Sequence, residues 1–139
     1  MTQQMTAEEF KGRRNRFAKG RTVRRAPGVM NKTEAEYAKL LDERVQRGEI
    51  LEYWFEGVTL RLADMCRLTP DFFVMLADGV CEIHEVKGFF EGDALVKMKV
   101  CAAMYPFRVI AVSKRAKKDG GGWNIREFSA MDVTIEVLG

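Results

Sequence analysis

The hydrophobic residues of this chain recur at helical spacing in two segments. The first runs from Asn31 to Gly48, where apolar positions lie three and four residues apart, as on one face of a helix. Thr33 is expected to be the N-cap, with Glu36 as its capping-box partner three residues later, and Gly48 marks the end. The expected apolar stripe consists of Tyr37, Leu40, Leu41 and Val45.

The second helical segment runs from Ala94 to Tyr105. It follows Gly92-Asp93 and stops before Pro106, because proline lacks the N–H that would continue a helix. Its expected apolar stripe consists of Leu95, Met98, Cys101, Ala102 and Tyr105.

Alternating and β-branched runs predict strands between and after these helices. Residues 50–62 alternate loosely, with a bulge or turn at Gly57. Apolar runs on either side of Asp78-Gly79 predict a β-hairpin. The remaining segments are a buried strand at 107–112, a basic, glycine-rich loop at 114–122, and two weaker strands near 123–128 and 133–137. This order, α-β-β-β-α-β with terminal strands, predicts an α/β fold in which helices flank a mixed central sheet.

The composition is that of one globular domain. At 139 residues, 47% of them hydrophobic, the chain is long enough to bury a core and too apolar to be disordered throughout. No apolar run approaches the roughly 18 residues of a membrane span, and the polar N-terminus lacks a signal-peptide core. Cys66, Cys81 and Cys101 are far apart and one must stay unpaired, which favours a reducing cytosol. His84 is the only histidine, which argues against a zinc site built from several His and Cys ligands.

Positive charge is concentrated at the N-terminus. Residues 1–32 contain nine Lys and Arg and two acidic residues, a net charge of +7, whereas the chain totals +3, so residues 33–139 carry −4. We expect residues 1–30 to be a flexible basic arm ahead of a domain at 31–139. Such an arm suits a polyanion, because each cation at a phosphate releases counterions; the alternative is a solvated leader. The arm residues expected to contact DNA are Arg13, Arg14, Arg16, Lys19, Arg21, Arg24 and Arg25.

The predicted hairpin brings acidic residues together with a lysine. Asp71 stands at the start of its first strand, and Glu85 and Lys87 stand near the end of the second. Because side chains alternate along a strand, Glu85 and Lys87 are expected on one face. Two carboxylates and a lysine at one end of a sheet suit the binding of Mg²⁺ and the positioning of a water against a phosphodiester. Taken singly, Asp71 is better explained as a turn residue after Pro70, and Glu85 and Lys87 as an exposed cross-strand pair; it is the whole pattern that favours the metal site.

The motif Thr69-Pro70-Asp71-Phe72, an intervening strand, and then Glu85-Val86-Lys87-Gly88 resembles the PD-(D/E)XK nuclease superfamily. The helical segment near 32–41 resembles the helix that gives many such nucleases a third acidic residue. The spacing is similar to that of small phage Holliday junction resolvases of the endonuclease I type and of other small phage proteins, over about residues 30–115. The resemblance implies a restriction-endonuclease-like fold.

The resemblance also implies roles for these residues. Asp71, Glu85 and the backbone carbonyl of Val86 would be ligands of Mg²⁺ or Mn²⁺, and Lys87 would orient the attacking water or stabilise the transition state. Glu34 and Glu36 compete for the third acidic role. Glu34 aligns with the apolar face of the helix and is expected to point toward the sheet, so we assign the role to Glu34 and leave Glu36 to the helix cap.

Other charged residues are secondary candidates. His84 and Glu82 should project from the face opposite to Glu85, which argues against His84 as a general base. Further phosphate contacts are expected, with solvated surface as the alternative, from Lys97, Lys99, Lys114, Arg115, Lys117 and Lys118.

The sequence is thus interpreted as a Mg²⁺-dependent DNA endonuclease, with Glu34, Asp71, Glu85 and Lys87 at its active site. By resemblance, the expected substrate is branched DNA, the expected assembly a homodimer, and the expected location the cytoplasm of a bacterial or phage-infected cell. The alternatives are a nicking or end-processing nuclease, a non-cutting DNA-binding accessory protein, and an RNA substrate.

Overall fold

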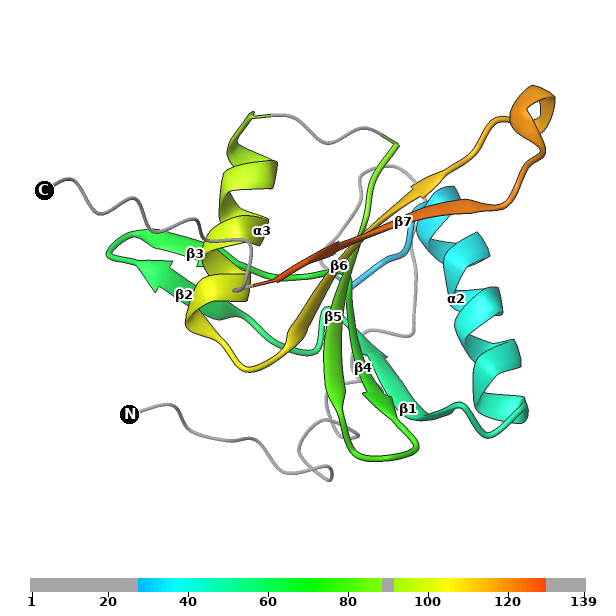
Figure 1. The fold of residues 1–139 in the computed structure, drawn as a ribbon, viewed down its shortest axis with the longest axis horizontal. Coiled ribbons are helices and arrows are strands. Elements are labelled where there is room, and N and C mark those ends of the chain that lie inside the picture. Colours follow the sequence, from blue (N-terminus) through cyan, green and yellow to red (C-terminus); the bar gives the residue numbers. More distant parts are fainter. Residues whose placement is uncertain (1–27, 89–91, 130–139) are drawn as a thin grey trace, which may run out of the picture.

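The computed structural model describes residues 28–88 and 92–129. Seven strands, two α-helices and one short 3₁₀-helix follow one another in this part of the chain (Figure 1). In order, they are α2 (Lys32–Gln46), β1 (Ile50–Phe55), β2 (Leu60–Ala63), β3 (Cys66–Leu68), β4 (Phe72–Leu76), β5 (Cys81–Val86), α3 (Gly92–Met104), β6 (Arg108–Lys114), η1 (Lys117–Asp119) and β7 (Trp123–Phe128).

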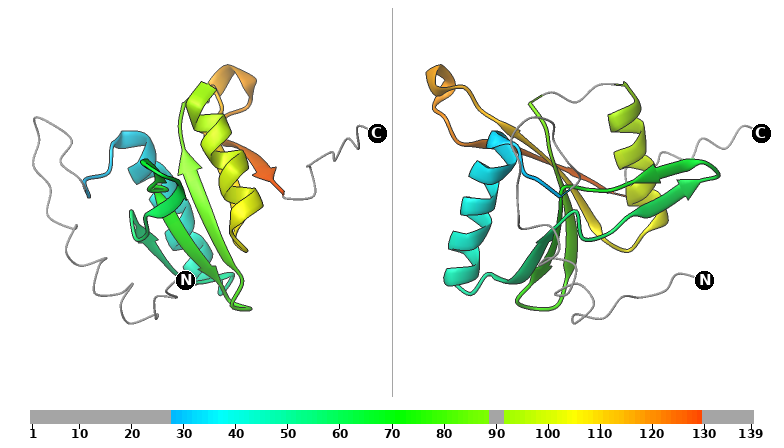
Figure 2. Two further views of the ribbon diagram at one scale, coloured as in Figure 1. Left: turned by 90° about the vertical axis from the view of Figure 1, so that its left-hand side faces the viewer. Right: turned by 180° about the vertical axis from the view of Figure 1, so that it is seen from behind.

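The centre of the fold is a five-stranded mixed sheet in the order β1-β4-β5-β6-β7. Strands β5 and β6 are parallel and are joined through α3, and the other neighbouring pairs are antiparallel. Helices α2 and α3 lie on opposite faces of this sheet (Figure 2). The predicted mixed sheet flanked by helices is therefore confirmed as an α/β architecture.

The core has two layers, one on each side of the sheet. Alternation along β4 directs Phe72 and Val74 toward Tyr37 and Leu41 of α2, and directs Phe73 toward Met98 and the other buried residues of α3. The same alternation applies to β5. Its even-numbered residues face α2 and its odd-numbered residues face α3. Each face of the strand therefore carries both apolar and polar side chains.

The start of α2 differs from the prediction made from the sequence. The N-cap is Asn31, whose side chain accepts a hydrogen bond from the Glu34 N–H at 2.8 Å, while the Glu34 carboxylate accepts from the Asn31 N–H at 3.0 Å. The predicted box of Thr33 and Glu36 is therefore wrong. Both pairs have the required three-residue spacing, and the chain uses the earlier one. At the other end of the stripe, Val45 is exposed rather than buried.

The predicted strand at 50–62 is divided between two sheets. Strand β1 ends at Phe55, and Glu56 adopts a left-handed backbone conformation with φ 48°. The chain then enters β2, which pairs with β3 in a separate two-stranded ribbon that the sequence pattern did not reveal. The turn or bulge expected at Gly57 is thus a change of sheet.

The remaining elements agree with the sequence to within two residues. The predicted hairpin is present as β4 and β5, and α3 is one of the two predicted helices. The weak strand at 123–128 is β7, whereas the one at 133–137 and the basic arm at 1–30, apart from its last three residues, lie outside the described residues. All three cysteines are free thiols. No described helix combines the length and apolar composition needed to cross a bilayer.

Candidate active site

Asp71 and Glu85 meet where β4 begins and β5 ends. Asp71 directly precedes β4 and Glu85 is the penultimate residue of β5, and the two strands are antiparallel neighbours. The Asp71 Oδ2 atom accepts a hydrogen bond from the Val86 N–H at 2.7 Å. Both carboxyl groups are buried, with only 8% of Asp71 and 7% of Glu85 exposed. The fold therefore places two acidic groups side by side in a poorly solvated position.

The surroundings of this pair resist its full ionisation. Burial raises the pKa of Asp71, and the charge of Glu34 adds to the shift, while the Val86 N–H opposes it. Burial also raises the pKa of Glu85, and the charge of Asp71 raises it further. The Glu85 Oε2 atom is buried without a hydrogen-bond partner among the described residues. Two adjacent buried carboxylates with an unsatisfied oxygen are costly alone, and a cation between them would offset that cost.

Pro70 bears on the third expected ligand, the carbonyl oxygen of Val86. The register of the hairpin pairs Phe72 with His84, so its continuation sets Val86 opposite Pro70. Proline has no N–H to donate to a neighbouring strand. The Val86 N–H is taken by the Asp71 side chain, and Pro70 cannot occupy the Val86 carbonyl. The proline of the motif thus makes no ladder hydrogen bond to the Val86 carbonyl oxygen.

Glu34 is the third acidic residue near this pair. It lies in the first turn of α2 and is 2% exposed, on the face that packs against the sheet. Its charge contributes to the raised pKa of Asp71, so the two groups are within electrostatic reach. The prediction that Glu34 points toward the sheet is confirmed. Its carboxylate also accepts two hydrogen bonds from Asn31, so the same side chain holds the helix cap.

Glu56 belongs to this region, although the sequence did not single it out. Its N–H donates to the Asp71 carbonyl at 2.7 Å, and its charge is a further cause of the raised pKa of Asp71. The Glu56 Oε2 atom accepts from the Gly28 N–H at 2.7 Å. Only the strained turn after β1 brings Glu56 here, and no motif marks it. The sequence indicated only that the strand is interrupted by a bulge or turn at Gly57.

Lys87 is exposed immediately beyond β5. Its N–H donates to the Val112 carbonyl at 2.9 Å, which holds the backbone against β6. The positive charge of Lys87 lowers the pKa of Glu85, partly opposing the effect of burial. The lysine is therefore close enough to influence the carboxyl pair while its ammonium group remains open to solvent.

This set of donors fits a hard divalent cation. The described residues contain no cluster of three or more His, Cys, Asp or Glu side chains with the geometry of a complete metal site. Two carboxyl groups and one carbonyl are nevertheless what Mg²⁺ commonly takes from a protein, the other positions going to water and substrate phosphate. The unsatisfied Glu85 oxygen supports this fit.

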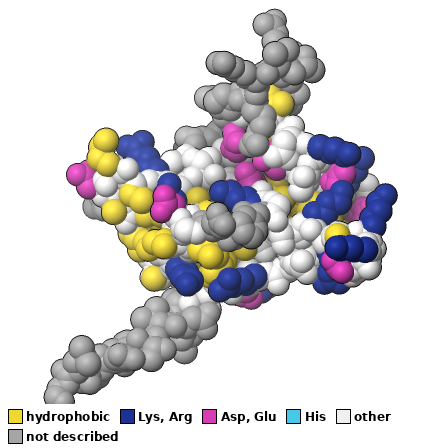
Figure 3. All heavy atoms as spheres, turned by 90° about the horizontal axis from the view of Figure 1, so that it is seen from above, with side chains coloured by type: hydrophobic (Ala, Val, Ile, Leu, Met, Phe, Trp, Pro, Cys, Tyr) yellow, Lys and Arg dark blue, Asp and Glu magenta, His cyan; other side chains and the backbone are white. Residues whose placement is uncertain are grey.

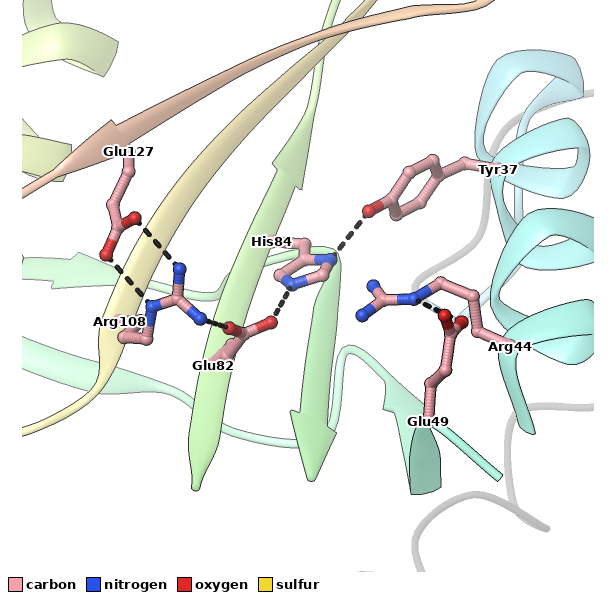
Figure 4. Close-up of polar contacts among 7 residues, drawn as sticks. All are labelled: Tyr37, Arg44, Glu49, Glu82, His84, Arg108 and Glu127. Atoms are coloured by element: carbon pink, nitrogen blue, oxygen red, sulfur yellow. Dashed lines mark hydrogen bonds and ion pairs between the residues drawn. The ribbon is translucent and has the colours of Figure 1, made fainter. Parts of the chain in front are cut away.

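His84 lies on the opposite face of β5, within a buried polar chain (Figure 4). Its Nδ1 atom is 2.7 Å from the Tyr37 hydroxyl of α2, and its Nε2 atom is 3.0 Å from Glu82. Glu82 binds Arg108, which also pairs with Glu127 of β7. A carboxylate only accepts, so the His84 Nε2 carries the proton and Nδ1 accepts from Tyr37.

This series of polar contacts ties α2 to the sheet. Burial is the main cause of the lowered pKa of His84, which therefore remains neutral, although Glu82 opposes the shift. Both ring nitrogens of His84 have partners away from Asp71 and Glu85, so a structural role explains this residue, in line with the expectation that argued against it as a general base.

The basic residues expected to contact DNA are in different situations. Lys97 donates to the Arg67 carbonyl of β3 at 3.2 Å, and Lys99 is exposed on α3. Lys114 is paired with Glu36, and Arg115 donates two hydrogen bonds to Asn124. Lys and Arg side chains gather at the right-hand side of the face shown in Figure 3. The seven arm residues, from Arg13 to Arg25, lie outside the described residues.

Comparison of the chain with protein-family models, with curated proteins and with solved structures found no match in any of the three. Fold alone does not determine function, which depends on the chemistry of the site.

Proposed function

We propose that this protein is a metal-dependent endonuclease with a restriction-endonuclease-like fold. The observation that carries the proposal is the buried pair of Asp71 and Glu85 at the ends of adjacent strands, with Lys87 two residues beyond. A structural role for the pair would be expected to satisfy both carboxyl groups with donors, whereas a Glu85 oxygen is left without one. A site that binds a cation and a phosphate accounts for this arrangement.

The residues of the proposed site have separate roles in binding the metal ion and the phosphate. Asp71, Glu85 and the Val86 carbonyl would hold Mg²⁺ or Mn²⁺, and the bound ion would acidify a water and neutralise charge on the phosphate. Lys87 extends into solvent, where its ammonium can orient the attacking water or bind a phosphate oxygen. Glu34 adds negative charge from α2 and favours binding of the cation. The Val86 N–H fixes the Asp71 carboxylate in place.

The substrate we propose is DNA, and more specifically branched DNA of the kind formed in phage recombination, cut by a homodimer. The motif spacing and the basic N-terminal arm support this choice. A nicking or end-processing nuclease would use the same site on another DNA structure. A non-cutting accessory protein would have no use for a carboxyl pair whose burial is costly.

The experiment is incubation of the purified protein with linear, nicked, forked and four-way DNA, in Mg²⁺ and in EDTA. Cleavage is expected only with the metal ion, and four-way or forked DNA is expected to be cut fastest. Binding without cleavage of any substrate in Mg²⁺ or Mn²⁺ would favour the accessory role.

A further inference from the structure

The β2–β3 ribbon has one apolar face and one basic face. Its apolar face, which includes Leu60 and Leu62, joins the core cluster on the α3 side. On the other face, Arg61 is directly opposite Arg67 and both side chains are exposed. Like charges at opposed positions of an antiparallel pair are destabilising. The position of these two arginines is therefore poor for folding and suited to an anion placed between them.

The charge of this arginine pair is only weakly balanced within the chain. The Arg61 guanidinium is 3.8 Å from Asp64, and both side chains are largely exposed. Arg67 forms no ion pair among the described residues, and Lys97 of α3 adds a third cation by donating to the Arg67 carbonyl at 3.2 Å. In Figure 3, basic, acidic and hydrophobic side chains lie together at the left-hand end of the molecule.

The tip of the ribbon is also unusual. Met65 is 96% exposed and has a left-handed backbone conformation, with φ 56°. In such a short hairpin turn, glycine or asparagine normally occupies the left-handed position, since a larger side chain is strained there. A methionine that is strained and buries nothing does not serve the fold. It is, however, suited to inserting against a DNA base, as apolar wedges do in DNA-bending proteins.

Hydrogen-bond donors continue from the tip toward the candidate active site. The exposed hydroxyls of Thr59 and Thr69 are 2.7 Å apart and come next after the arginine pair in the ribbon's register. Thr69 is two residues before Asp71, and β3 leads directly into β4 (Figure 1). Donor pairs two residues apart on a strand are about 6.8 Å apart. These exposed donors, from the arginine pair to Thr59 and Thr69, form a track that leads along the chain toward Asp71.

We propose that the β2–β3 ribbon binds the backbone of duplex DNA, with Arg61 and Arg67 on a phosphate and Met65 against a base at a distorted step. The direction of the track toward a scissile bond rests on the proposed function, but the contact itself requires neither metal nor catalysis. It can therefore be measured separately, by fluorescence anisotropy of labelled duplex and four-way DNA in EDTA over a range of salt concentrations.

The test variant is Arg61→Gln with Arg67→Gln. The matched control is Lys39→Gln with Arg47→Gln, which removes the same charge from exposed positions of α2 and its C-cap. The ribbon variant should lower the log–log salt slope of binding by about 0.9, the value for one neutralised phosphate, and the control should change it little. Thermal stability should not fall in the ribbon variant, because the mutation removes a repulsion.

Met65→Gly supplies a second measurement. Glycine relieves the left-handed backbone, so the melting temperature should hold or rise, while binding of four-way DNA should weaken more than binding of intact duplex. An unchanged salt slope in the arginine variant, or no DNA binding by the wild type, would overturn the ribbon proposal. Wild-type protein that binds DNA with the expected slope but cuts none would overturn the nuclease function and leave the ribbon in place. Cleavage by the wild type together with normal DNA binding by the arginine variant would overturn the ribbon proposal and leave the nuclease function in place.

Discussion

The side chain of Asp71 accepts a hydrogen bond from the backbone N–H of Val86 at 2.7 Å. This contact engages the Val86 N–H where the β4–β5 ladder reaches Pro70, and it fixes the start of β4 against the end of β5. It also aims the Asp71 carboxyl group at the same position as Glu85. One hydrogen bond therefore completes the hairpin and sets the geometry of the candidate active site.

Loss of either carboxylate should lower the cleavage activity for a reason other than unfolding. Asp71→Asn or Glu85→Gln should reduce Mg²⁺-dependent cleavage by at least ~100-fold, more than the loss of a group that merely orients a ligand. Because both groups have raised pKa values from burial and mutual repulsion, Glu85→Gln in EDTA at pH 8 should increase the unfolding free energy, on the order of 1 kcal/mol. Cleavage assays and chemical denaturation provide the two measurements.

The same variants discriminate against a purely structural pair. If Glu85→Gln is destabilised in EDTA and cuts DNA at the wild-type rate, Asp71 and Glu85 serve the fold and not a cation. Addition of Mg²⁺ should raise the melting temperature of the wild type and leave that of Glu85→Gln nearly unchanged, since ligand binding stabilises only the protein that binds it.

The two glutamates of α2 should differ in function. Glu34→Gln should slow cleavage strongly and cost less than about 1 kcal/mol of stability, because glutamine still fits the capping box with Asn31. Glu36→Gln should be nearly silent in both measurements, since it removes only an exposed ion pair with Lys114.

Asn31→Ala is the control for the cap. It should cost about 1 kcal/mol and slow cleavage much less than Glu34→Gln does. Equal losses of activity in Asn31→Ala and Glu34→Gln would mean that Glu34 acts only by holding the helix.

His84 should make stability depend on pH. Its pKa is lowered in the folded protein, chiefly by burial, so below about pH 6.5 the unfolded chain binds a proton that the folded chain does not. The contribution of His84 to stability is therefore complete above pH 6.5 and is lost as the pH falls toward its folded pKa. The difference in unfolding free energy between wild type and His84→Gln should shrink from pH 7.5 to pH 5.

Comparison with a variant is needed because Asp71 and Glu85 act in the opposite direction. Their raised pKa values favour the folded state as the pH falls, and this effect is present in both proteins and cancels. A difference that stays constant with pH would show that His84 titrates alike in the folded and unfolded states.

Deletion of residues 1–27 tests the basic arm and keeps Gly28, whose N–H binds Glu56. The deletion removes eight Lys and Arg residues. If half of them contact phosphates, the log–log salt slope of DNA binding should fall by about three to four units. Cleavage at saturating protein and low salt should persist, because the candidate site begins at Glu34. An unchanged slope would make the arm a leader without DNA contacts.

The sequence by itself determined the features that depend on local chemistry. Helical spacing from Tyr37 onward predicted α2, and the Asp78-Gly79 turn between apolar runs predicted the β4–β5 hairpin. Once the hairpin was recognised, period-two alternation also predicted that Glu85 and His84 lie on opposite faces. These predictions succeeded because period and turn type are set by neighbours along the chain.

Only the tertiary structure decided what depends on contacts between distant segments. Asn31 with Glu34 and Thr33 with Glu36 have the same spacing, and the packing of α2 on the sheet selected the first pair. The left-handed turn at Glu56 moved β2 out of the main sheet and brought that carboxylate beside Asp71, which no local pattern encodes. The link from Tyr37 to His84 spans 47 residues. The raised pKa values of Asp71 and Glu85 arise because folding removes both from water at one position, and burial is a property of the whole fold.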